Sequence, residues 1–193
     1  AAAYLDEYPQ ARVLHVGCGL DSRFIRLEGM YAHWTDLDMT DVIALRRRLF
    51  DEYPGYRMIS GSLTDRQWRA DVEPGKPLLV IAEGVLMYLR EQEVKDFFLL
   101  LKSEYPGTRI IFDAYSTMTA ASVHRHSALA RTKAEIRWGI DDLRDICLWG
   151  DGTVVKGIYF FTGMKEVDLL PRFWRRSFQL ANRIPFVRQA HRT

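Results

Sequence analysis

The chain has 193 residues, of which 48% are hydrophobic and 27% charged, and its formal net charge at pH 7 is +2. These values are typical of a globular protein, and we expect residues 1–193 to form a single domain with a sizeable core. The small net charge gives no general attraction to nucleic acid or membrane, and no apolar run approaches the roughly 18 residues of a membrane span. Two cysteines are too few for a disulfide framework or a metal set, so we expect a cytoplasmic protein.

The first predicted elements are the end of a helix over residues 1–8, stopped by Pro9, and a buried strand after it. The strand opens the sequence RVLHVGCGLDSRF, residues 12–24, in which Gly17 and Gly19 break the apolar run and predict a sharp turn into a helix. Glycines let a bound ligand approach the backbone closely. Asp21 would repel a pyrophosphate at this turn, so S-adenosylmethionine, which has a ribose but no phosphate, suits it better than a dinucleotide. A tight turn that binds nothing would show the same glycine pair.

The second predicted strand spans residues 31–38 and ends on acidic side chains. Asp38 lies 19 residues after Gly19, close to the spacing of about 20 at which an acid at the end of the second strand binds a ribose diol. The acids here, Asp36 and Asp41 included, also suit the capping of the following helix. Because capping and ribose binding are compatible for neighbouring acids, we predict that Asp38 contacts the ligand.

A helix and a third strand follow. Helical periodicity predicts the helix over residues 42–50, and the arginine run at residues 46–48 is expected to face solvent. Residues 57–63 are the predicted third strand, and Ser62 and Leu63 lie at its carboxyl end. In an α/β sheet this end can hold an adenine between backbone amides and an apolar side chain, although an ordinary capped turn would give the same pattern.

A continuous apolar run over residues 78–82 predicts a strand buried on both faces, as a parallel sheet requires. Glu83 follows it at once, at the same edge as Gly19 and Asp38. A predicted helix comes next, with apolar residues at helical spacing from Val94 to Leu101. A strand over residues 109–113 follows it. This alternation predicts an α/β fold, an open and mostly parallel sheet with helices on both faces and a site along its carboxyl edge.

The remainder of the chain is less regular. We expect residues 115–135 to form a polar cover of the substrate side and residues 138–148 a short helix. A sixth strand is predicted over residues 153–162 and a final edge strand over residues 184–188, which makes about seven strands in all. The basic amphipathic stretch over residues 165–193 is expected to dock on the sheet with its arginines facing water, rather than bind a membrane surface or an acidic partner. His124 and His126 have no third ligand in spacing, so we predict no metal site.

Four stretches, in this order and spacing, resemble the leucine carboxyl methyltransferase and tetracenomycin polyketide O-methyltransferase family. They read VGCGLDSRFIRL, WTDLDMTDVIALRR, LLVIAEGVLMYL and RIIFDAY, and the resemblance covers residues 9–115. It implies a Rossmann-like class I methyltransferase fold that uses S-adenosylmethionine. It also implies methylation of an oxygen on a small organic acceptor, such as a polyketide-like hydroxyl or a carboxylate, as in secondary metabolism.

The resemblance implies roles for particular residues. Gly17 and Gly19 match the turn under the amino acid end of the cofactor, and Glu83 matches an acid near that end. Asp38 matches the acid that binds the ribose.

The remaining implied contact is to the adenine, through Ser62 and Leu63. The family often has Asp where this chain has Ser62. Family members usually carry several helices before the first strand, with a basic residue that grips the cofactor carboxylate, and we expect this chain to lack them. If those helices close over the cofactor, the chain should bind weakly and turn over slowly without them.

Two other functions fit parts of the sequence. A nicotinamide-dependent oxidoreductase would want a third glycine at the position of Ser22 and a separate substrate domain. A catalytically silent module that binds S-adenosylmethionine would keep the same edge without chemistry. The catalytic residues are unknown, and no general base is expected to be indispensable, because a carboxylate acceptor needs none. The candidates near the predicted edge are Tyr88, Asp113, Tyr115, His124 and His126.

Overall fold

The structure is a computed structural model, and it describes residues 1–122, 135–159, 169–172 and 175–176. The chain divides into two compact units. The first unit comprises residues 1–85 and 96–112, and the second comprises residues 86–95 and 113–193. The single domain expected from the sequence stays a prediction.

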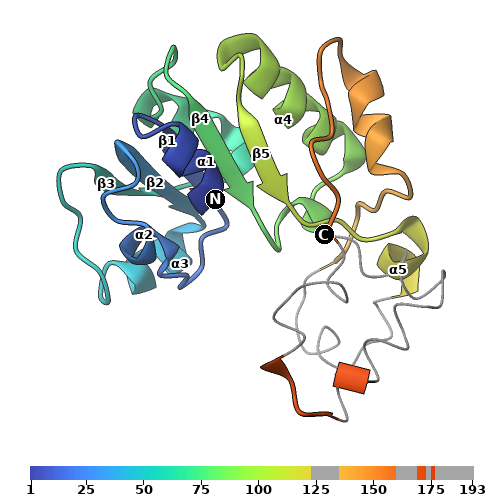
Figure 1. The fold of residues 1–193 in the computed structure, drawn as a ribbon, viewed down its shortest axis with the longest axis horizontal. Helices are drawn as coiled ribbons and strands as arrows, with labels where there is room; N and C mark the ends of the chain where they lie inside the picture. Colours follow the sequence, from blue (N-terminus) through green and yellow to red (C-terminus); the bar gives the residue numbers. More distant parts are fainter. Residues whose placement is uncertain (123–134, 160–168, 173–174, 177–193) are drawn as a thin grey trace. The chain divides into compact units, whose positions relative to one another are not determined.

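The first unit is built on a parallel sheet of five strands within the described ranges (Figure 1). The strands are β1 (Arg12–Val16), β2 (His33–Asp38), β3 (Tyr56–Ser60), β4 (Leu78–Ala82) and β5 (Arg109–Phe112). Their order is β3-β2-β1-β4-β5, and all four pairings are parallel. The order reverses between β1 and β4, and in open α/β sheets the ligand binds at the carboxyl ends of the strands beside such a reversal. The predicted α/β class, Rossmann-like and open, is confirmed.

One face of the sheet is covered by short helices. These are α1 (Ala2–Glu7), α2 (Arg23–Arg26) and α3 (Thr40–Arg46). Leu5, Phe24 and Ile43 bring them into one apolar cluster with Trp34 and Leu79 of the sheet. Because side chains alternate along a strand, every second residue of β2 faces this cluster.

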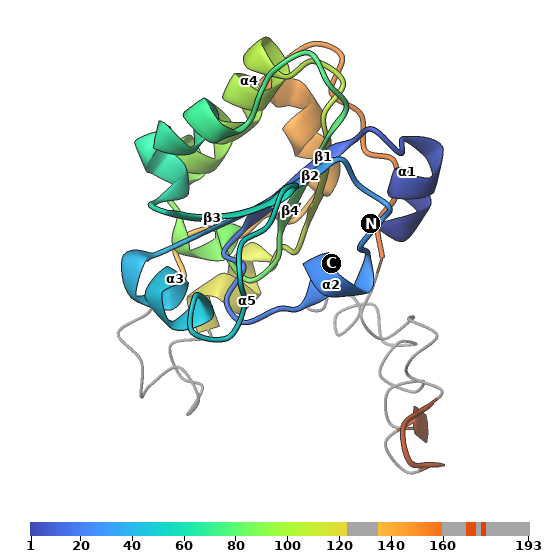
Figure 2. The ribbon, with the colours of Figure 1, turned by 90° about the vertical axis from the view of Figure 1, so that its left-hand side faces the viewer.

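The opposite face carries the 3-10 helix η2 (Gln67–Asp71) and residues 96–104 of α4 (Glu91–Glu104), as Figure 2 shows. Trp68 of η2 lies against the rings of Phe97 and Tyr105, with ring centroids 6.1 Å away in each case. All five residues of β4 are buried, so the strand is covered on both faces as its apolar run predicted.

The second unit contains the 3-10 helices η3 (Leu86–Tyr88) and η5 (Leu143–Trp149) and the helix α5 (Thr117–Ser122). Met87, Ala120 and Ile136 form its buried cluster, and Tyr115 packs against them. The helix expected at residues 138–148 begins later, at Leu143, because the side chain of Asp142 accepts the Arg144 N–H and caps it there.

The sixth strand is wrong for residues 153–159, which form no strand in the structure. The β-branched and aromatic side chains that suggested it are largely in solvent, with Val154 65% and Tyr159 70% exposed. Strand propensity has its effect through packing against a neighbouring strand, and these side chains have no such packing. Residues 160–162, the edge strand at 184–188 and most of the basic stretch at 165–193 lie outside the described residues. None of the described helices is both long and apolar enough to cross a membrane.

Candidate functional site

The loop after β1 depends on two glycines with positive φ. Gly17 has φ of +62° and Gly19 has φ of +50°, a region that residues with a side chain rarely adopt. A Cβ on Gly17 would lie 2.0 Å from Cγ2 of Val85, which follows β4. A Cβ on Gly19 would meet no atom within 4 Å. Gly17 therefore permits close packing of the loop on the segment after β4, and Gly19 leaves open space beside the loop.

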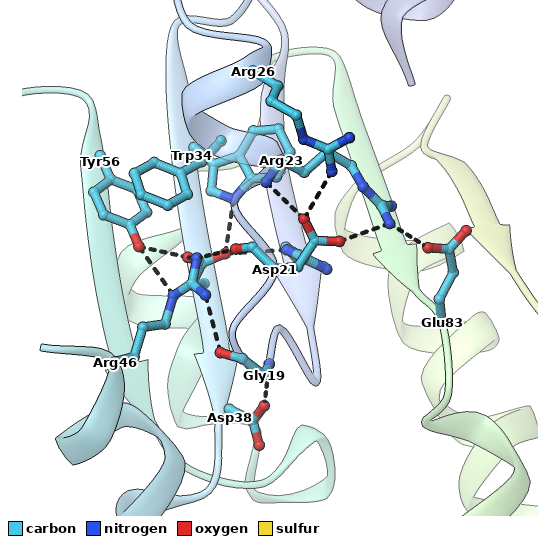
Figure 3. A network of polar contacts seen from close by, with 12 residues as sticks. Gly19, Asp21, Arg23, Arg26, Trp34, Asp38, Arg46, Tyr56 and Glu83 are labelled. Carbon is cyan, nitrogen blue, oxygen red and sulfur yellow. Dashed lines mark hydrogen bonds and ion pairs between the residues drawn. The ribbon is translucent and has the colours of Figure 1, made fainter. Parts of the chain in front are cut away.

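Asp38 ties the end of β2 to this loop. Its Oδ2 accepts the N–H of Gly19 at 2.8 Å (Figure 3), and its Oδ1 accepts the N–H of Met39 at 2.7 Å. One residue earlier, the carbonyl of Leu37 accepts the N–H of Gly17 at 2.7 Å. The structure therefore brings together the glycine loop and the acid that the spacing singled out.

An arginine that the sequence reasoning did not single out joins Asp21 to Glu83. Nη2 of Arg23 lies 2.8 Å from Oδ2 of Asp21 and 2.6 Å from Oε2 of Glu83. Asp21 also pairs with Arg26, whose Nη2 is 3.1 Å from Oδ1. Arg23 links the loop after β1 to the acid after β4, two segments that meet where the strand order reverses (Figure 3). The position of an arginine at the start of a helix, two residues after an acid, was the available signal.

Asp21 is held in its charged form. Burial alone would raise the pKa of its carboxyl, but the charge of Arg23 and the backbone N–H of Arg23, which donates to Oδ1 at 2.6 Å, lower the pKa overall. This carboxylate accepts a hydrogen bond from a backbone N–H at the start of α2. In dinucleotide-binding proteins an N–H in this position binds the pyrophosphate. The arrangement therefore suits a ligand without phosphate groups at this turn.

Beneath the loop lies a buried ion pair. The side chains of Asp36 and Arg46 are 0% exposed, and Nη2 of Arg46 is 2.5 Å from Oδ2 of Asp36. Tyr56 donates its hydroxyl to the same oxygen at 2.6 Å, and the Trp34 indole donates to Oδ1 at 2.8 Å. Burial lowers the pKa of Arg46, but the charge of Asp36 and the hydrogen bond to Tyr56, together with the nearby Cys18, raise the pKa overall. Burial and the bond to Asp36 raise the pKa of Tyr56, so the phenol is neutral.

The solvated face expected for residues 46–48 is therefore wrong at Arg46. This residue lies three positions after the buried Ile43, so both side chains are on the inner face of α3. Arg47 and Arg48 are exposed, as expected. The run of three arginines does not itself show which side chain points inward. The helical spacing of three residues from Ile43, a core residue, was the signal that could have identified Arg46.

Arg46 also reaches the glycine loop itself. Its Nη1 donates to the carbonyl of Gly19 at 2.9 Å, and its Nη2 donates to the carbonyl of Asp21 at 2.7 Å (Figure 3). The guanidinium carbon lies 5.1 Å from the ring centroid of Phe24 and 4.9 Å from that of Phe50. The buried cation is thus held by the loop, the sheet and two aromatic faces at once.

Ser62 and Leu63 have structural partners. The Ser62 side chain accepts the N–H of Thr64, and Asp65 accepts the N–H of Ser62, which makes a capping box at the start of the 3-10 helix η1 (Leu63–Asp65). Leu63 is 6% exposed. Gly61 donates its N–H to the carbonyl of Asp38 at 2.9 Å, so this turn is joined to the end of β2. The capped turn that the sequence allowed is present, and a contact of this pair with adenine stays a prediction.

All five candidates for a general base belong to the second unit, and Tyr88, Asp113 and Tyr115 are the three that the structure describes. Burial raises the pKa of Tyr115, and the nearby Asp113 and Tyr88 raise it further, so Tyr115 is a neutral phenol at physiological pH. Tyr88 is 37% exposed. His124 and His126 lie outside the described residues, and among the described residues no three His, Cys, Asp or Glu side chains are grouped as metal ligands.

The family model described as leucine carboxyl methyltransferase matches residues 3–101. The tetracenomycin polyketide synthesis O-methyltransferase TcmP of Streptomyces glaucescens is 38% identical over 147 residues, covering 76% of this chain and 54% of the relative. The S-adenosyl-L-methionine-dependent methyltransferase dpfgK of Gibberella zeae is 30% identical over 158 residues, covering 74% and 53%.

Among solved structures, the methyltransferase domain of bacterial CtHen1-CN is 18% identical with a TM-score of 0.49, covering 76% of each chain. The chain spans about half the length of the curated relatives it matches. The family model covers more than half of the chain, including the glycine loop, Asp38 and Glu83, and we conclude that the chain belongs to the leucine carboxyl methyltransferase family.

Proposed function

We propose that this chain binds S-adenosylmethionine at the carboxyl edge of its sheet and takes part in methyl transfer to an oxygen of a small organic acceptor. The observation that carries the proposal is the glycine loop at the strand reversal, where Gly19 leaves open space and donates its N–H to Asp38. Family membership supports it, and the relative TcmP is named as an O-methyltransferase of polyketide synthesis.

In this proposal each part of the cofactor has a partner at the edge. Each Asp38 oxygen accepts one backbone N–H, and a carboxylate oxygen has a second lone pair for a ribose hydroxyl. Gly17 and Gly19 lie under the amino acid end, and Glu83 accepts from its ammonium group. Ser62 and Leu63 lie beside the adenine.

Asp21 favours this cofactor over a nicotinamide dinucleotide. Its carboxylate, kept charged by Arg23, occupies an amide at the start of α2 and would repel a pyrophosphate. S-adenosylmethionine is positive at its sulfonium and carries no phosphate, so it meets no such repulsion. Asp21 acts here by selecting against phosphate and by holding Arg23.

The chemistry asks little of the protein beyond alignment. Bound S-adenosylmethionine supplies a methyl group on a sulfonium, which is already an activated donor. The chain's own task is to hold the acceptor oxygen in line and to keep water away. A carboxylate acceptor is deprotonated at neutral pH and needs no base, and the raised pKa of Tyr115 keeps that phenol from acting as an efficient one.

The protein's setting is also part of the proposal. Cys18 and Cys147 are both free, and Cys18 is buried. These thiols support a reducing, cytoplasmic setting. We propose secondary metabolism as the context, with a small molecule rather than nucleic acid or membrane as the partner.

Binding is tested by calorimetry with S-adenosylhomocysteine and, separately, with NADH. We expect binding of the first and none of the second. Asp38→Ala should weaken binding by about 1 to 3 kcal/mol, because ribose hydroxyls lose a charged acceptor. Asp41→Ala, which removes an exposed carboxylate three residues later, is the matched control and should bind as the unchanged chain does. Equal affinity of the Asp38 and Asp41 variants would remove Asp38 from the site.

Turnover separates an enzyme from a silent binding module. Transfer of a labelled methyl group from S-adenosylmethionine should be measured across a panel of polyketide-like phenols and carboxylic acids. Labelled product with any member supports the methyltransferase. Tight cofactor binding without product on the whole panel would favour the silent module.

A further inference from the structure

Arg46 uses all three nitrogens of its guanidinium, and two of them reach the backbone of the glycine loop. Nη1 binds the Gly19 carbonyl, Nη2 binds the Asp21 carbonyl and Asp36, and Nε binds the Tyr56 hydroxyl at 3.1 Å. A cation with no exposed surface is expensive to bury unless charge and hydrogen bonds compensate it. Here the compensation comes partly from the carbonyls of the loop.

These two bonds set the direction in which the loop amides point. In a planar trans peptide the N–H of the next residue points opposite to the carbonyl. When Arg46 turns the carbonyls of Gly19 and Asp21 inward, the N–H groups of Leu20 and Ser22 are turned the other way. The orientation of these peptide groups therefore depends on a side chain from α3, not on the loop alone.

We propose that Arg46 is a positioning residue of the cofactor site, which acts by holding the glycine loop in its ligand-binding conformation from beneath. This inference rests on the proposed binding of S-adenosylmethionine. A lysine at this position would keep the charge opposite Asp36, but its single ammonium cannot reproduce the planar fork that reaches both carbonyls and Tyr56.

Arg47 provides a matched control from the same helix end. Its Nη2 also donates to a backbone carbonyl, that of Met58 at 2.7 Å, and lies 3.7 Å from Glu52. It is exposed, and its bonds do not involve the glycine loop. Arg47→Lys therefore makes the same chemical change as Arg46→Lys without touching the loop.

The first experiment measures the affinity of the full chain for S-adenosylhomocysteine in both variants. We expect Arg46→Lys to weaken binding about tenfold or more, because a rigid donor fork to the loop is lost, and Arg47→Lys to leave it unchanged. The carbonyl carbon of Gly19 and the amide nitrogen of Leu20 should shift in the NMR spectrum of Arg46→Lys alone. A folded Arg46→Lys that binds as Arg47→Lys does would overturn the proposal.

The second experiment needs no variant, so it holds if Arg46→Lys does not fold. In the unchanged chain with 15N-labelled arginine, S-adenosylhomocysteine should move the Nε–H signal of Arg46 and leave that of Arg47 in place. Binding with no change at Arg46 would overturn the proposal. Absence of binding by the unchanged chain would instead overturn the proposed function, and the role of Arg46 in it as well.

Discussion

Asp36 and Asp38 lie two residues apart on β2, and their distance from the strand end gives them different partners. Asp36 is inside the strand, under α3, and its charge is neutralised by Arg46 with help from Trp34 and Tyr56. Asp38 is the last residue of the strand, where it meets the N–H of Gly19. One acid therefore stabilises the layer beneath the loop, and the other meets the loop itself.

Spacing predicted Asp38 but not Asp36, because a ligand-binding pattern records only residues at the end of a strand. A buried acid needs a buried cation, and the partner of Asp36 lies ten residues later in a run of three arginines. Arg23 was missed for a related reason. Its ion pair with Glu83 joins residues 60 positions apart, so the sequence beside Arg23 indicates its contact with Asp21 but not its contact with Glu83.

Asp21 leads to a pH-dependent prediction. Its pKa is lowered in the folded chain, so the stability it contributes is present above the ordinary Asp pKa of about 4 and is lost as the pH falls through the folded value. Asp21→Asn should lower the free energy of unfolding by about 1 kcal/mol at pH 7, since two arginines lose a charged partner and the backbone N–H of Arg23 loses a charged acceptor. The difference from the unchanged chain should shrink below pH 4 or so.

The measurement is urea unfolding of both chains at pH 7 and at pH 3. Asp41→Asn serves as the control, because it removes a carboxylate that is exposed on the first turn of α3. A difference that is as large at pH 3 as at pH 7 would mean that the charge of Asp21 is not what stabilises the turn.

The bounds of a strand were predictable where its own amino-acid composition determines them. The apolar run at residues 78–82 became β4 with the same bounds, because a strand covered on both faces has to be apolar throughout. β2 begins at His33, two residues later than the alternation suggested, since its ladder with β1 starts with the pair of Arg12 and His33. Residues 153–159 show that strand propensity without a neighbour makes no strand.

Alanine substitutions at the two glycines of the loop after β1 should have different effects. Gly17→Ala adds a positive-φ penalty and a clash with Val85, which should lower the free energy of unfolding by about 2 to 5 kcal/mol. Gly19→Ala adds the positive-φ penalty alone, about 1 to 2 kcal/mol, but its methyl group enters the open space beside the loop. It should therefore fold and lose affinity for S-adenosylhomocysteine.

Denaturant unfolding and calorimetry on the two variants check this pair. A Gly17→Ala chain as stable as Gly19→Ala would show that the segment carrying Val85 shifts freely. A Gly19→Ala chain that binds S-adenosylhomocysteine at full affinity would show that the space beside Gly19 is not where the ligand lies.

The part of the chain that matches the family model does not coincide with either of the two compact units. The family model covers residues 3–101, which run through parts of both units. The sequence predicted one domain because composition and the alternation of strands and helices show no break. It could not predict that residues 86–95 group with the second half of the chain, because that grouping comes from long-range contacts.

Neither unit is a continuous piece of chain, and this predicts how the molecule unfolds. Residues 91–95 of α4 belong to the second unit and residues 96–104 to the first. Val94 and Leu101, one in each part, are 0% and 1% exposed, so each part of the helix carries a buried side chain. Helix formation is cooperative, and melting either part weakens the other. We therefore expect the units to unfold together as one domain.

Fluorine NMR of the chain labelled with 5-fluorotryptophan tests this expectation during thermal unfolding. Trp68 reports on the first unit and Trp138 on the second, and both are buried, so each signal should move to its unfolded position when its own core opens. Coincident midpoints for the two signals support a single cooperative domain, since independent domains melt independently. A Trp138 signal that reaches its unfolded position while Trp68 stays native would show that α4 does not couple the units, and the chain would then consist of two domains.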